Sequence, residues 1–249
     1  NIKMSANNGF VDSMVKYIQI LGESNPKDEN EILKYVKLAA DNDHLVSMLY
    51  YGQCLENGDG VEMNKKDAAS YYKKAADRGN AKAQNRYGKM LFNGEGISVD
   101  KKERIKYFKM AADNGIETAM KNIAMIFYHG IGIECNKKEA AKYFKMHAKT
   151  SNDYESTFNY GLMCLKGEGV PENHIKAAKY FKLAADNGNA ETMLIYATML
   201  DKGEGIQVNI DESKKYLLMA KENGYEDAKE ALSLIKNKQL FEKYCHHFK

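Results

Sequence analysis

The sequence predicts an all-α fold, a solenoid of stacked helical hairpins. Three observations predict this class: a glycine-rich turn that recurs at a nearly fixed spacing, a tyrosine at a fixed distance after each turn, and a composition that suits helices. The chain has 249 residues, only two prolines and no tryptophan, and 44% of its residues are hydrophobic. A chain of this length can bury a large core, and we expect residues 1–249 to form one elongated array.

The recurring turn has the pattern Gly-x-Gly followed by Val or Ile. Its first glycines lie 36, 36, 37 and 36 residues apart, at Gly58, Gly94, Gly130, Gly167 and Gly203, and a tyrosine follows each of them by thirteen residues. One period before Gly58, Gly22 precedes Tyr35 by the same distance, so a sixth, degenerate turn is predicted there. A fixed period of this length indicates a repeat array.

Glycine-rich turns before helices also occur in nucleotide-binding proteins, where they cradle a phosphate. Such a loop is needed once, whereas this turn occurs five times. None of the five copies continues as Gly-Lys-Ser/Thr, and none fits the spacing GxGxxG. The repetition favours an architectural turn, and no cofactor is expected.

The segment after each turn carries the signals of a helix start. A capping Asp or Asn stands six residues after the first glycine, at Asp28, Asn64, Asp100, Asn136, Asn173 and Asn209. An acid follows three residues later in five of the six copies, which suits a capping box and the helix dipole. Apolar or small residues then recur with helical spacing, as at Ala177, Tyr180, Phe181 and Ala184, so one face is expected to be buried.

A second helix is expected between this helix and the next turn. The first helix should end at a glycine such as Gly79, Gly115, Gly188 or Gly224, because glycine adopts the left-handed conformation without steric cost. In the second helix, the pairs Tyr87-Gly88 and Tyr160-Gly161 place a small residue beside a large one, which permits close packing of helices. Each hairpin is too small to bury its own apolar face and needs its neighbours. A last helix is predicted over residues 225–248.

The Tyr-Gly pairs, the GxG[V/I] turn, the helix rich in Ala, Tyr and Phe and the AADxG ending together resemble the Sel1-like repeat family, relatives of the tetratricopeptide repeat. The best copies are residues 80–115 and 154–188. The resemblance implies a right-handed superhelical scaffold that brings other proteins together and has no chemistry of its own. The repeat that ends at Ser151 departs from the family, because HAKTSN replaces AADNG, and its packing is expected to be irregular.

Charge and cysteine content narrow the function classes. The net charge is only +3, so no overall field favours nucleic acid or membranes. The cysteines do not follow the repeat and form no CxxC pair, so we expect reduced thiols and a cytoplasmic or possibly nuclear setting. Because the chain opens inside the array, a targeting signal upstream would not be visible.

Catalytic and metal-binding interpretations have less support. His147 occupies a column otherwise filled by alanine, and packing is its default role, with a switch or ligand as the alternative. Cys245, His246 and His247 lie in the C-terminal tail and would need a further ligand to hold a metal. The acids of the turns lie on separate repeats and cannot act as an acid–base pair. We therefore predict that the chain is not an enzyme.

Lysines recur on the helices after the turns and are predicted to form a ladder along the convex side. They are Lys34, Lys37, Lys106, Lys109, Lys142, Lys145, Lys179 and Lys182. Such a ladder could bind RNA or acidic lipids through phosphates. Acids interleave with it, which favours an ordinary solvated surface, so nucleic acid and membranes are not the expected partners.

By analogy with tetratricopeptide repeats, the helix before each turn lines a concave groove. The residues predicted to face its basic part are Lys82, Asn85, Arg86, Lys89, Asn93, Lys121 and Asn122. Those predicted for its apolar part are Phe92, Met125, Tyr128, Phe158, Asn159, Leu162 and Ile195. Cations that face one groove repel each other, so an anionic ligand explains their grouping better than packing does. The expected partner is a protein segment with an acidic part and apolar anchors.

The sequence thus favours a non-catalytic scaffold or adaptor that binds a partner segment in this groove. A targeting or regulatory repeat module of a larger enzyme, such as a protein kinase, is the alternative. A partner that binds an edge of the array, or repeats outside this chain, also remains open.

Overall fold

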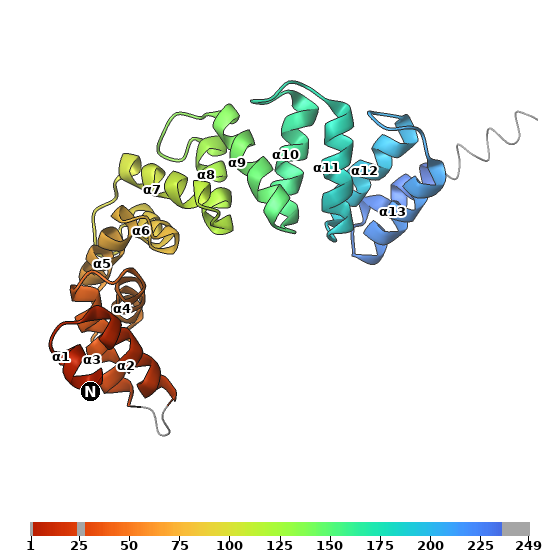
Figure 1. Ribbon diagram of the computed structural model, residues 1–249. Helices are drawn as coiled ribbons and strands as arrows, with labels where there is room; N and C mark the ends of the chain where they lie inside the picture. The colour runs from red at the N-terminus through yellow and green to blue at the C-terminus, as the bar shows by residue number, and fades with distance from the viewer. Residues whose placement is uncertain (1, 24–27, 236–249) are drawn as a thin grey trace, which may run out of the picture. The chain divides into compact units, whose positions relative to one another are not determined.

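The computed structural model describes residues 2–23 and 28–235 (Figure 1). Within these ranges the chain is helical and has no strand. The helices are α1 (Ile2–Asn7), α2 (Val11–Glu23), α3 (Glu29–Asp41), α4 (Leu45–Asn57), α5 (Lys65–Asp77), α6 (Ala81–Asn93), α7 (Lys101–Asp113), α8 (Glu117–His129), α9 (Lys137–Thr150), α10 (Tyr154–Lys166), α11 (His174–Asp186), α12 (Ala190–Lys202) and α13 (Ile210–Glu222). The predicted fold class, an all-α array of helical hairpins, is confirmed.

The helices form two compact units, Asn1–Ile123 (unit 1) and Ala124–Lys249 (unit 2), and the boundary lies inside α8. Neighbouring helices pack side by side from α1 to α7 in unit 1 and from α9 to α13 in unit 2 (Figure 1). Packing between nearest neighbours is the organisation of a repeat array. That residues 1–249 form one domain stays a prediction.

At the C-terminus, residues 227–235 are helical. The rest of the helix predicted for residues 225–248 lies outside the described residues, as do Cys245, His246 and His247. The described cysteines, Cys54, Cys135 and Cys164, are free thiols.

Side-chain caps start the helices after the turns, as predicted. The side-chain oxygen of Asn64 accepts a hydrogen bond from the backbone N–H of Asp67 at 3.0 Å, and Asp28, Asp100, Asn136, Asn173 and Asn209 act in the same way. Four even-numbered helices, α4, α6, α10 and α12, are capped as well, by His44, Asn80, Asp153 and Asn189, which the sequence analysis missed. Each cap satisfies a backbone donor that the helix itself leaves free.

Glycines end the even-numbered helices at the predicted turns. Gly58, Gly94, Gly130, Gly167 and Gly203 all have positive φ values, between 67° and 82°. Gly22 differs from the prediction, because it lies within the last turn of α2 and does not have a positive φ. The sixth turn therefore does not begin at Gly22.

The odd-numbered helices end before a second set of left-handed glycines, Gly79, Gly115, Gly188 and Gly224. Two helices differ: α3 is followed by Asp43 with a φ of 69° in place of glycine, and α9 has 14 residues rather than 13 and a C-cap, Ser151, in an extended conformation. The sequence change from AADNG to HAKTSN thus alters the end of this helix, and the irregular packing expected for this repeat stays a prediction.

The glycine of the Tyr-Gly pairs lets two helices approach closely. A methyl group at Gly52 of α4 would lie 2.7 Å from the ring of Tyr72, which belongs to α5. The same holds for Gly88 and Phe108 in unit 1, at 3.0 Å, and for Gly161 and Phe181 in unit 2, at 2.9 Å. All three aromatic side chains are fully buried. The small residue thus makes room for the largest side chain of the core.

The second glycine of the turn lies against the preceding repeat. A side chain at Gly96 would overlap the backbone carbonyl of Lys65, the first residue of α5. In unit 2, Gly169 and Gly205 contact the backbones of Lys137 and His174 in the same way. The Gly-x-Gly pattern therefore serves both the left-handed turn and the contact between repeats.

A tyrosine and an aspartate also join successive repeats. The hydroxyl of Tyr107 donates a hydrogen bond to Asp77, thirty residues earlier, and Tyr71 and Tyr216 donate to Asp41 and Asp186 at 2.5 Å. The ammonium group of Lys73 lies 2.9 Å from the Tyr107 hydroxyl. This gives a role to the aspartate of the AADxG ending, which the sequence analysis did not assign.

Gly96→Ala should destabilise the protein more than Gly79→Ala. Both glycines have a positive φ, 71° and 92°, so alanine adds about 1 kcal/mol of backbone strain at either position. Only at Gly96 does the new methyl group meet the Lys65 backbone, whereas nothing lies within 4 Å of it at Gly79. We expect an additional loss of about 2 kcal/mol at Gly96 in the free energy of unfolding measured with urea. Equal losses would mean that the turn does not bear on the preceding repeat.

Tyr107→Phe should reduce the free energy of unfolding by about 1 kcal/mol at neutral pH, because the Asp77 carboxylate loses a hydrogen bond. Burial opposes the charged form of Asp77, but the Tyr107 hydroxyl and the Lys73 ammonium outweigh it and lower the pKa of Asp77. A lowered native pKa contributes stability that is present above the ordinary Asp pKa of about 3.9 and is lost as the pH falls through the native pKa. The gap between wild type and Tyr107→Phe should therefore narrow as the pH falls from about 6 to about 3.

The matched control is Tyr180→Phe. Tyr180 stands in the same column, but thirty residues earlier the irregular repeat has Thr150 in place of aspartate. We expect little change at any pH. A loss as large as that of Tyr107→Phe would contradict the role assigned to the aspartate.

Candidate partner-binding surfaces

The predicted basic surface lies on α6 and the first part of α8, both in unit 1. Lys82 and Lys89 are exposed and two helical turns apart, so they share one face of α6. The Nδ2 group of Asn85 donates to Thr118 Oγ1 at 3.0 Å, which places α6 beside the start of α8, the helix that carries Lys121 and Asn122. The structure thus brings Lys82 and Lys89 together on one exposed face.

Two residues of this basic surface differ from the prediction. Asn85 is only 8% exposed, because it fills the contact between α6 and α8. Arg86 is half-buried and pairs with Glu56 at 3.5 Å. That carboxylate also accepts a hydrogen bond from Tyr72 at 2.6 Å. Arg86 therefore has a role in the fold, and its charge does not require an anionic ligand.

Phe92 and Asn93 lie at the C-terminal end of α6. Phe92 is 38% exposed, and the guanidinium of Arg104 lies 4.8 Å from the centre of its ring. Asn93 donates to the Glu95 carboxylate of the adjoining turn at 2.7 Å. Phe92 is thus available as an apolar contact, whereas Asn93 supports the turn.

The remaining predicted residues belong to unit 2. Met125, Tyr128, Phe158, Asn159, Leu162 and Ile195 are all half-buried. The Tyr128 ring lies 3.2 Å from the ammonium group of Lys137, and the Phe158 ring packs against Phe181 with 6.0 Å between centres. Apart from Phe92, the predicted apolar part therefore belongs to unit 2, whereas the basic part belongs to unit 1.

The lysine ladder makes contacts within the protein. Lys182 pairs with Glu212 at 3.1 Å and lies 2.7 Å from the hydroxyl of Tyr216. The ammonium groups of Lys34, Lys106 and Lys142 lie between 4.6 and 5.8 Å from the ring centres of the neighbouring tyrosines. These contacts explain the positions of half of the ladder's lysines, Lys34, Lys106, Lys142 and Lys182, without a bound ligand.

His147 is buried, at 4% exposure, in a column of alanines. Its Nδ1 lies 2.8 Å from Ser156 Oγ and 3.6 Å from a carboxylate oxygen of Asp153. Ser156 is fully buried, so neither side chain can meet a substrate. The default prediction of a packed histidine is confirmed.

Neither a metal-binding cluster nor a membrane-spanning helix is found among the described residues. Over residues 2–23 and 28–235, no group of three or more His, Cys, Asp or Glu side chains is arranged to hold a metal ion. In the same ranges no helix is long and apolar enough to span a membrane.

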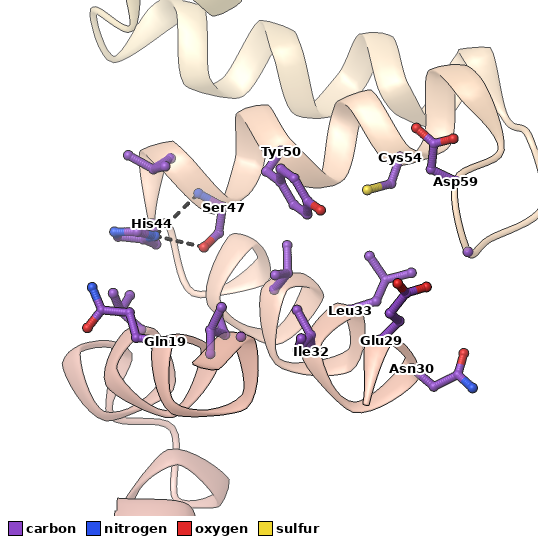
Figure 2. Close-up of a pocket in the computed structure, with 16 residues that line it drawn as sticks. Gln19, Glu29, Asn30, Ile32, Leu33, His44, Ser47, Tyr50, Cys54 and Asp59 are labelled. Carbon is purple, nitrogen blue, oxygen red and sulfur yellow. Dashed lines mark hydrogen bonds between the residues drawn. The ribbon is translucent and has the colours of Figure 1, made fainter. Parts of the chain in front are cut away.

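The structure also shows a pocket of about 740 Å³ between α2, α3 and α4 of unit 1, which the sequence analysis missed (Figure 2). Polar and apolar residues both line it; the apolar ones are Val15 and Ile18 from α2, Ile32, Leu33 and Val36 from α3, and Val46 and Tyr50 from α4. Val46 is 63% and Tyr50 50% exposed, so both leave much apolar surface in contact with water. Apolar surface of this kind is typical of binding sites.

The two ends of this pocket differ in polarity. At one end His44 and Ser47 satisfy each other, with 2.8 Å between His44 Nδ1 and Ser47 Oγ (Figure 2). At the other end lie the carboxylates of Glu29 and Asp59, beside the buried thiol of Cys54 (Figure 2). Burial raises the pKa of the Cys54 thiol, and Asp59 raises it further. Of the described residues that line the pocket, none is a lysine or arginine.

A signal for the acidic end was present in the sequence. Glu29 is the first residue of α3, and the corresponding residues of α5, α7 and α9 are Lys65, Lys101 and Lys137. The change from lysine to glutamate stands out only when the repeats are aligned on their turns.

Known proteins share this architecture. Among solved structures, a protective antigen of uropathogenic Escherichia coli strains with an SLR fold shares 25% identity and a TM-score of 0.76, over 96% of this chain and 51% of that one. A Sel1 repeat protein from Oxalobacter formigenes shares 22% identity and a TM-score of 0.74, over 91% of this chain and 66% of that one. This chain therefore spans between about half and two thirds of the length of those proteins. No curated protein sequence matches it.

A family model describes most of the helix pairs. The Sel1 repeat model matches residues 45–80, 81–116, 118–149, 155–189 and 190–225. These ranges correspond to the pairs α4–α5, α6–α7, α8–α9, α10–α11 and α12–α13. Since the matches cover more than half of the residues and follow the observed helix pairs, the chain belongs to the Sel1 repeat family.

Proposed function

We propose that this chain is a non-catalytic adaptor that holds a segment of a partner protein against the exposed faces of its even-numbered helices. Sel1 repeats generally serve as protein-interaction modules. One observation carries the proposal: the buried faces of these helices repeat, whereas the exposed faces differ. The position twelve residues before the turn glycine, which is exposed in four of the five repeats and half-buried at Glu155, holds Val46, Lys82, Thr118, Glu155 and Glu191.

The exposed faces of α4 and α6 have properties that suit a protein partner. Val46, Tyr50 and Phe92 expose between 38% and 63% of their surface, although the neighbouring faces of the same helices are fully packed. Exposed aromatic and aliphatic side chains next to polar ones are typical of sites that anchor a partner. In this proposal, Val46, Tyr50 and Phe92 contribute more to the free energy of partner binding than to the free energy of folding.

The face of α6 defines the chemistry of one partner segment. Neither Lys82 nor Lys89 forms an ion pair with another described residue, and Phe92 lies near Lys89 on the same helix. An acidic segment with an apolar side chain would match both features. Attraction between the opposite charges would mainly speed association.

The double variant Lys82→Glu/Lys89→Glu tests this surface. We would select binders from a random dodecapeptide library displayed on phage and then measure the affinity of selected acidic peptides by fluorescence anisotropy. Because both lysines are exposed, the variant should fold normally. It should bind these peptides at least about tenfold more weakly, which is on the order of 1.4 kcal/mol.

The matched control is Lys66→Glu/Lys102→Glu, which changes the charge by the same amount on exposed residues of α5 and α7. The control should keep its affinity. Equal weakening of both variants would indicate a general charge effect, and a library that yields no peptide specific for the chain would contradict the proposed function.

A further inference from the structure

The pocket between α2, α3 and α4 lies where the array departs from its own pattern of ion pairs. At two other junctions, a lysine at the start of an odd-numbered helix pairs with the acid of the following turn. Lys65 pairs with Glu95 at 2.7 Å, and in unit 2 Lys137 pairs with Glu168 at 3.3 Å. One period before Lys65 and Glu95, the corresponding residues are Glu29 and Asp59. At this junction an acid therefore stands in the place of the lysine.

The replacement leaves two carboxylates at one end of the pocket (Figure 2). Burial raises the pKa of the Tyr50 hydroxyl, and the charges of Cys54, Asp59 and Glu29 raise it further. Among the described residues, neither acid has a cationic partner; Asp59 accepts only a hydrogen bond from Asn57, at 3.0 Å. The acid of this turn thus lacks the lysine that Glu95 has in the next repeat.

The turn that contains Gly60 also packs less closely against the preceding helix, α3, than the turn that contains Gly96 packs against α5. A methyl group at Gly96 would overlap the backbone of Lys65, but the nearest atom to a methyl group at Gly60 is Leu33 Cδ2, at 3.1 Å. A flexible side chain, rather than the backbone of α3, thus fills this contact. The looser contact and the missing ion pair distinguish this junction from the one that joins Lys65 and Glu95.

The walls of the pocket specify an apolar occupant. Val46 and Tyr50 expose 63% and 50% of their surface on one side, and Ile32 and Leu33 of α3 lie half-buried on the other. A volume of about 740 Å³ is sufficient for several side chains of a peptide. Covering this apolar surface would stabilise a complex by the hydrophobic effect.

We propose that this pocket binds a protein segment in which a lysine or arginine stands beside aliphatic or aromatic side chains. The cation would lie between Glu29 and Asp59, where Lys65 lies in the next repeat, and the apolar side chains would pack between Val46, Tyr50 and Leu33. This partner differs in charge from the acidic segment assigned to α6. The inference rests on the proposed adaptor function and adds a second site with its own specificity.

Other occupants fit less well. An anionic segment would meet two carboxylates, and no lysine or arginine is among the described residues that line the pocket. A bound metal ion is not favoured, because no group of three potential ligand side chains is found among the described residues. A peptide cation needs only the two acids and gains the apolar walls as well.

The library selection described above, with the wild-type chain, should yield a second class of peptides that combine Lys or Arg with aliphatic or aromatic residues. Glu29→Lys should abolish this class, with affinities at least tenfold weaker by fluorescence anisotropy. The substituted side chain can pair with Asp59 as Lys65 pairs with Glu95, so this variant should melt at the same temperature as wild type or higher. Replacing the peptide's own cation with glutamine should weaken binding to wild type by a similar factor.

Two further variants keep the test sharp. Tyr50→Ala removes part of the apolar wall without changing charge and should also weaken the cationic peptides, whereas Glu62→Lys changes an exposed acid that does not line the pocket and should leave them unaffected. Lys82→Glu/Lys89→Glu should affect only the acidic class, so failure at one site is distinguishable from failure at the other. The proposal is wrong if no cationic class is selected, if this class survives Glu29→Lys, or if Glu29→Lys and Glu62→Lys weaken it equally.

Discussion

The contact between one repeat and the next is the interaction on which the rest of the structure depends. A hairpin of two thirteen-residue helices cannot bury its own apolar face, so its stability comes from its neighbours. The second glycine of the turn lies against the start of a helix in the preceding repeat, and the column tyrosine donates to an aspartate thirty residues earlier. Both contacts occur in each unit, and they engage the turns and the odd-numbered helices rather than the exposed faces of the even-numbered ones.

The candidate binding surfaces are places where a residue departs from what this contact requires. Lys65 and Glu95 satisfy each other across a junction, whereas Glu29 and Asp59 at the junction before it do not. Not every departure exposes a site, however. His147 replaces an alanine, but Ser156 satisfies its ring nitrogen within the core. The difference lies in whether the protein itself supplies the partner for the unusual side chain.

Much of the fold could be predicted because its signals are local and repeated. The caps, the left-handed glycines and the helical spacing of apolar residues each depend on a few neighbouring residues, and they occur at the expected positions. Gly22 was placed in a turn because its distance to Tyr35 fits the period, yet it has no second glycine after it and remains within α2. The roles of Asp77 and Arg86 depend on residues thirty positions away, so they emerged only with the packing of the helices. For the same reason, Glu29 gained a meaning only once Lys65 was seen to pair with Glu95.

If the even-numbered helices bind partners and the odd-numbered ones only hold the array together, the division should be visible in hydrogen–deuterium exchange of the chain with and without a bound peptide. A cationic peptide should slow exchange in α4 and at the turn that contains Asp59, and an acidic peptide should slow it in α6. Exchange in the middle of α5 and α7 should stay unchanged in both complexes. Protection that appears first in α5 or α7, with α4 and α6 unaffected, would contradict this division of roles between the two sets of helices.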